Sequence, residues 1–93
     1  MRIELEVELS ETVEPGSTLE TRRFSRDVDM ELPALGDEIE LNVAAEPVLA
    51  IVTNISRDIE DAPCRVRVRS DSLTFKSLRD DERWNEKLLA PGA

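Results

Sequence analysis

The chain of 93 residues is long enough for one small domain, and a chain of this size buries roughly 60–65% of its unfolded surface in one modest core. Its formal net charge is −9, from 21 acidic and 12 basic residues, which argues against binding of a nucleic-acid backbone or an anionic membrane surface. One cysteine and no histidine exclude an internal disulfide, the usual zinc sites and a Ser-His-Asp or Cys-His catalytic pair within the chain.

The amino-terminal segment and the apolar runs bear on localisation. Glu4 and Glu6 stand where a secretory signal peptide carries an apolar run. No stretch approaches the roughly 18 apolar residues that a membrane-spanning helix needs. We therefore expect a cytoplasmic protein that does not cross or bind a membrane.

The first predicted strand has the clearest pattern. Apolar residues occupy every second position from Ile3 to Leu9, and Glu4, Glu6 and Glu8 stand between them. A period of two is typical of a half-buried β-strand. Residues 10–18 are expected to form a loop with a turn at Pro15-Gly16.

A second, less regular strand is predicted from about Leu19 to Leu32. Phe24, Val28 and Met30 share one register, and Arg26 falls on that same inward face. An arginine in such a position usually pairs with a carboxylate at the mouth of a barrel. The alternative is an arginine that grips a ligand.

Two further strands follow a turn over residues 33–37. The third is predicted from Glu38 to Val43, with Ile39, Leu41 and Val43 facing the core. The fourth is predicted from Val48 to about residue 57 and begins with five apolar residues in succession. Such a run suits a strand covered on both sides. We expect one cover to be the core and the other to come from the C-terminal tail or from a second subunit.

The fifth predicted strand follows a loop over residues 58–63. From Cys64 onward, residues expected to face the core alternate with arginines. The arginines are Arg65, Arg67 and Arg69. Opposite charges directly across two strands contribute about 0.2–1 kcal/mol, so this strand is expected beside the glutamates of the first strand. That pairing would close a small barrel and remove two sheet edges.

The tail, residues 72–93, carries balanced charges and a different pattern. Ser77 is predicted to cap a short helix from about Leu78 to Leu89 that ends at Pro91-Gly92. Its apolar residues would lie within an arc of roughly 140°. Trp84 is expected to anchor the tail on the barrel or on a partner.

These patterns predict a mainly β fold. We expect a small five-stranded antiparallel barrel or strongly curved sheet, of the SH3-like small-barrel type, with one short C-terminal helix. Residues 1–71 would form the barrel domain, and residues 72–93 a helical tail packed on the barrel or on a partner.

One motif resembles a known family. Arg22 and Arg26, followed by Asn54 and Ser56, are similar to the cyclic-dinucleotide motifs of PilZ domains, which are also small β-barrels. Ile59 stands where the second motif of the family continues to a glycine. The resemblance implies a small-ligand sensor in which Arg22 and Arg26 hold the ligand.

The sequence predicts no catalytic residue, no cofactor-binding residue and no metal site, and we do not expect an enzyme. The expected function is that of a non-catalytic protein-interaction or accessory module that binds another protein or itself as a homodimer, without nucleic acid or metal. The alternatives are an acidic inhibitor or nucleic-acid mimic that binds a basic partner, and the PilZ-like sensor. The candidate interaction surface consists of Leu49, Trp84, Leu88 and Leu89.

Overall fold

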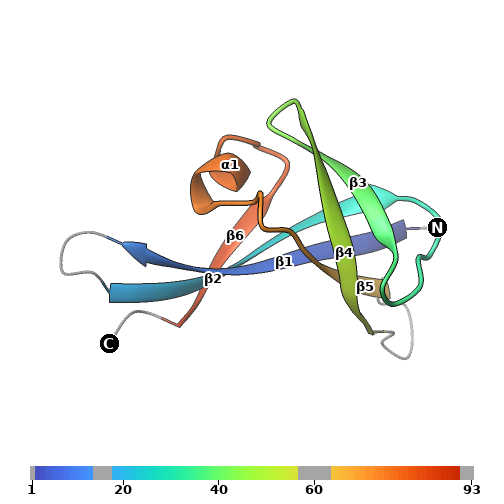
Figure 1. Cartoon of the computed structure of the whole chain (residues 1–93), viewed down its shortest axis with the longest axis horizontal. Coiled ribbons are helices and arrows are strands. Elements are labelled where there is room, and N and C mark those ends of the chain that lie inside the picture. The colour runs from blue at the N-terminus through green and yellow to red at the C-terminus, as the bar shows by residue number, and fades with distance from the viewer. Residues whose placement is uncertain (1, 14–17, 57–63, 91–93) are drawn as a thin grey trace.

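The computed structural model describes residues 2–13, 18–56 and 64–90, and these form one open, curled sheet with a short helix beside it (Figure 1). The strands are β1 (Arg2–Val13), β2 (Thr18–Asp29), β3 (Glu38–Val43), β4 (Glu46–Ser56), β5 (Cys64–Arg69) and β6 (Asn85–Ala90), and the helix is α1 (Phe75–Arg79). Their order in the sheet is β3-β4-β5-β1-β2-β6. The mainly β fold with one short helix is confirmed.

The predicted neighbourhood of the first and fifth strands is confirmed, with the predicted charge pairs. Glu4 lies opposite Arg65, and Glu6 lies opposite Arg67. The two strands run parallel, however, whereas every other neighbouring pair is antiparallel. Because β1 and β5 meet in the middle of the sheet, their pairing closes no barrel, and β3 and β6 remain as edges. The expected five-stranded antiparallel barrel is therefore replaced by a six-stranded mixed sheet.

The β1–β2 hairpin is longer than the sequence indicated. The two strands pair continuously from Arg2 opposite Asp29 to Val13 opposite Thr18. Residues 10–13, expected to begin a loop, thus continue the strand. The predicted turn at Pro15-Gly16 and the loop at 58–63 lie outside the described residues.

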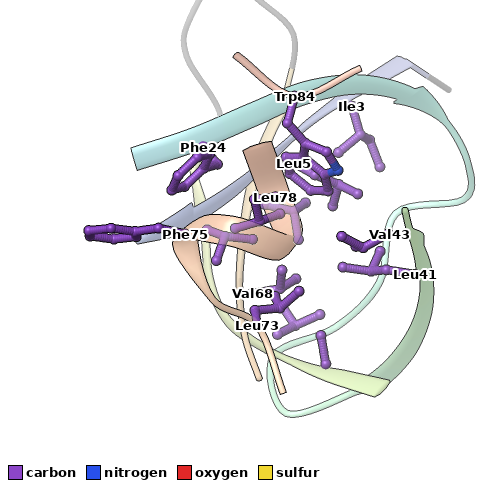
Figure 2. Packing of buried hydrophobic residues seen from close by; sticks show 14 residues of the cluster. Ile3, Leu5, Phe24, Leu41, Val43, Val68, Leu73, Phe75, Leu78 and Trp84 are labelled. Carbon is purple, nitrogen blue, oxygen red and sulfur yellow. The ribbon is translucent and has the colours of Figure 1, made fainter. Parts of the chain in front are cut away.

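The core fills the concave side of the sheet, under α1. Figure 2 shows Leu78 of α1 among side chains of the strands, including Leu5 and Phe24. The predicted inward residues of the first, third and fifth strands are buried together, apart from Ile39 and Leu9, which are partly buried at the margin of the cluster. The buried apolar residues on the strands are Ile3, Leu5, Val7, Phe24, Leu41, Val43, Ala50, Val52, Cys64, Val66 and Val68.

The predicted helix over residues 78–89 is wrong. The helix begins earlier, because Thr74 and not Ser77 is the N-cap: the Thr74 side chain accepts the amide of Ser77, and the Ser77 hydroxyl accepts the amide of Thr74. After Arg79 the chain turns, and Asn85–Ala90 pairs with β2 as an edge strand. Backbone hydrogen bonds to an open sheet edge thus outweigh the helix propensity of this segment.

The turn between β3 and β4 has an unusual sequence. It consists of Ala44 and Ala45, whose φ angles are 51° and 65°. Two-residue hairpin turns with positive φ at both positions normally carry Asn or Gly, because the Cβ of other residues is strained there. The turn is therefore formed in a strained conformation.

Replacing Ala45 by glycine should relieve part of this strain. We expect Ala45→Gly to raise the free energy of unfolding by about 0.5–1 kcal/mol, because relief at positive φ exceeds the added flexibility of the unfolded chain. Urea unfolding followed by Trp84 fluorescence measures the change. Ala34→Gly, at an exposed position without positive φ, is the control and should be neutral or destabilising. An equal loss in both variants would contradict the prediction.

Candidate interaction surface

The convex face of the sheet, away from α1, carries a ladder of ion pairs over its centre. Arg65 lies 3.4 Å from Glu4, and Arg67 lies 3.1 Å from Glu8. Arg23 of β2 approaches the same glutamates from the other side, at 2.8 Å from Glu8 and 3.2 Å from Glu6. Hydrogen bonding to Glu8 raises the pKa of Arg23 above its ordinary value. The acidic side chains of β1 are thus engaged within the molecule.

Beside this ladder the same face becomes apolar. Leu49 and Ile51 of β4 are 62% and 50% exposed, while Ala50 and Val52, which alternate with them, are buried in the core. Leu49 and Ile51 line an open groove of about 550 Å³. The rest of its lining is polar: Thr53, Arg69, Ser70, Asp71 and Ser72. We call this surface the β4 groove.

The described tail does not cover the β4 groove. β6 lies at the opposite edge of the sheet, with β5, β1 and β2 between it and β4. Leu88 on β6 is 42% exposed and Leu89 is partly buried. Trp84 is buried in the core, where it joins the tail to the sheet. The four predicted surface residues are therefore dispersed, and only Leu49 lies on the β4 groove.

The charges around the β4 groove are loosely paired. Arg69 lies 3.9 Å from Asp71, and both side chains are largely exposed. On the other flank, Glu38 lies opposite Ile51 and Glu40 lies opposite Leu49. Within the described residues neither glutamate forms an ion pair or a side-chain hydrogen bond. The groove thus has an acidic rim along β3.

Arg22 is held by neighbours within the molecule. Its guanidinium donates to Glu20 at 2.9 and 3.0 Å and to Glu86 at 2.6 Å. It also lies 6.0 Å from the ring centroid of Phe75. Arg22, which the sequence suggested as a ligand-binding residue, therefore contacts β2, β6 and α1 within the molecule.

Arg26 lies opposite Leu5 on the face of the sheet that carries α1. Its guanidinium lies over the ring of Trp84, 5.6 Å from the centroid, and its Nε is buried without a hydrogen-bond partner among the described residues. Burial, and then the nearby charge of Arg83, lower its pKa from the ordinary value. Among the described residues no carboxylate forms an ion pair with Arg26, and Asp81, whose charge acts to raise the pKa of Arg26, is bonded to Arg83.

The residues of the PilZ-like motif do not converge. Arg22 and Arg26 lie opposite Leu9 and Leu5 on β1, and thus on the face that carries α1. Asn54 and Ser56 lie opposite Arg67 and Arg65 of β5, on the convex face. The two halves of the motif are therefore on opposite sides of the sheet.

Asp81 forms a polar cluster that sequence reasoning missed. Its carboxylate is almost fully buried and accepts the side chain of Arg83 at 2.7 and 2.9 Å and the backbone amides of Arg83 and Ala44, each at 3.1 Å. Arg83 also donates to the backbone carbonyl of Asn42 at 2.9 Å. These bonds, above all those from Arg83, hold the pKa of Asp81 well below its usual range. The cluster ties the end of β3 to the turn that precedes β6.

Removing the charge of Asp81 should destabilise the fold in a pH-dependent way. We expect Asp81→Asn to lower the free energy of unfolding at pH 7 by about 1–3 kcal/mol, because buried donors lose their acceptor. The folded pKa lies below the unfolded value of about 3.9. The carboxylate's contribution is therefore complete above about pH 4 and is lost as the pH falls through the folded pKa.

Urea unfolding at pH 7 and pH 3 measures this effect. The difference between the original chain and Asp81→Asn should be smaller at pH 3. Asp80→Asn, at an exposed residue bonded to Lys76, is the control and should change stability by less than about 0.5 kcal/mol. A difference that is the same at both pH values would show that the charge contributes nothing.

Comparison with protein-family models, with curated proteins and with solved structures finds no match to this chain. No helix in the described part of the chain is long and apolar enough to cross a membrane. Among the described residues no group of His, Cys, Asp and Glu side chains is arranged to hold a metal ion.

Proposed function

We propose that the protein is a non-catalytic protein-interaction module whose β4 groove binds another protein chain. The observation that carries this proposal is the exposure of Leu49 and Ile51 on a strand whose alternate residues are buried. Each aliphatic side chain that a partner removes from water contributes roughly 25 cal/mol per Å² of buried apolar surface.

The setting of the β4 groove supports a binding role. β4 is hydrogen-bonded to β3 on one side and to β5 on the other, so Leu49 and Ile51 stand on a rigid support. Binding to such a surface costs little conformational entropy, because the backbone is already ordered. The apolar centre with a polar rim is also the usual anatomy of a protein interface.

The acidic-mimic alternative draws less support from the geometry. A mimic of a phosphate backbone needs a row of free carboxylates, and those of β1 are engaged with Arg23, Arg65 and Arg67. Near the groove, the acids of the described segments that form no ion pair are Glu38 and Glu40, on a single short strand. We therefore favour an interface with an apolar centre over one made of charge alone.

Site-specific photo-crosslinking in the native host tests the proposal. A benzophenone side chain introduced at Leu49 should yield a discrete covalent adduct with a protein, either another chain or a second copy. Ile51→Glu in the same chain should abolish the adduct, because a charge then occupies the groove. Leu19 is the matched control, since it is a leucine of similar exposure, 59%, on the distant part of β2. Equal adduct patterns at positions 49 and 19 would refute the proposal.

A further inference from the structure

The free edge of β3, next to the β4 groove, has its backbone groups directed outward at defined positions. The turn at Ala44-Ala45 joins Val43 to Glu46 as a directly opposed pair, and the carbonyl of Asp37 accepts the amide of Val52. Since these odd-numbered residues bond to β4, the even-numbered residues direct their amides and carbonyls away from it. The bond from Arg83 to the carbonyl of Asn42 agrees with this alternation.

Two residues of this edge are therefore open. Arg83 occupies the carbonyl of Asn42, whereas no described residue bonds to the outward backbone groups of Glu38 and Glu40. An open strand edge is a template for an added strand. The exposed carboxylates of Glu38 and Glu40 protect this edge against acidic or neutral strands and favour basic ones.

The molecule already contains one pair of strands in which an acidic strand lies beside a basic one. β1 presents Glu4-Leu5-Glu6-Val7, and β3 presents Glu38-Ile39-Glu40-Leu41, the same alternation of acid and aliphatic residues. The neighbour of β1 is β5, which alternates arginine with valine and places Arg65 and Arg67 directly opposite Glu4 and Glu6. β3 has β4 on one side, and on its other side lies no strand of the described part of the chain.

We propose that the edge of β3 binds an extended segment of a partner protein in which Lys or Arg alternates with aliphatic residues. The backbone of the segment pairs with Glu38 and Glu40, and its basic side chains lie opposite these glutamates. Its aliphatic side chains face Ile39, which is only partly buried at this edge. The inference rests on the proposed function, because it names the chemistry of the partner.

A second copy of this chain is a poor occupant of the edge. Its arginine-rich strand, β5, is already paired on both sides, with β4 and with β1. The net charge of −9 also opposes the approach of two copies through their acidic edges. The arrangement of charge therefore selects a basic segment from another protein.

Binding of a capped peptide of about eight residues that alternates arginine and valine tests the proposal on the intact chain. In amide hydrogen exchange, the amides of Glu38 and Glu40 should gain protection when the peptide is present. The amides of β6, the other edge, should not change. A peptide that alternates glutamate and valine is the matched control and should not bind. Protection at β6 instead of β3 would overturn the proposal.

Charge variants separate specific pairing from general attraction. Glu38→Arg with Glu40→Arg should weaken binding of the arginine peptide at least about tenfold, since two favourable cross-strand pairs become repulsive. Glu31→Arg with Glu82→Arg makes the same change in net charge at two exposed acids outside β3 and should weaken binding by less than about threefold. Equal losses in the two double variants would overturn the proposal.

Glu40→Pro tests the backbone contribution. Proline removes the outward amide of an edge strand without removing a bond to β4, so the fold should persist. Binding should fall below that of Glu40→Gln, which loses the same charge and keeps the amide. Loss of edge binding while crosslinks from Leu49 persist would refute the strand addition and leave the proposed function standing. Edge binding without a Leu49 adduct would refute the role of the β4 groove instead.

Discussion

The buried carboxylate of Asp81 is the polar contact that joins the two ends of this curled sheet. Strand twist and the register shifts at Thr21/Arg22 and Val52/Asn54 bend the sheet, and a bond between its ends then holds it over a common core. Here Asp81 accepts the amide of Ala44, and Arg83 donates to the carbonyl of Asn42, so the tip of the β3–β4 hairpin is attached to the turn that precedes β6. The sheet thereby encloses Leu78 and Trp84 as a barrel would, although its strands do not close.

The convex face shows how a strongly acidic chain can carry few free acids at its centre. The glutamates of β1 lie between arginines of β5 on one side and Arg23 of β2 on the other, so that each carboxylate has a cation at hand. Exposed pairs of this kind contribute little individually, but they determine which strands can be neighbours. The acids of β3 lie outside this arrangement, and the proposed binding edge follows from that difference.

The strict period of two predicted the strands, and the burial of their inward residues, such as Leu5 and Val68, in one core is confirmed. Charge alternation also predicted that β1 and β5 are neighbours. It could not predict their direction, because alternating charges match equally well in parallel and antiparallel pairs.

β6 was missed because Glu86, Lys87 and Leu88 are good helix formers, and only the open edge of β2 makes them a strand. The bond between Asp81 and Ala44 joins residues far apart in sequence and leaves no local signal. The exposed apolar face of β4 was visible as an uninterrupted apolar run, although the residues that cover a face cannot be identified from such a run.

The parallel pairing of β1 with β5 has a consequence for the newly made chain. β1 is synthesised first, but one of its two neighbours is encoded after most of the chain, so the middle of the sheet stays incomplete until late. Contacts between such distant segments form slowly, because a long loop must be closed. During that interval β2 can already pair with one edge of β1, while the edge that β5 will occupy stays open. The glutamates of β1 then repel the same edge of other nascent chains, and Glu4 and Glu8 gain Arg65 and Arg67 as ion-pair partners only when β5 arrives.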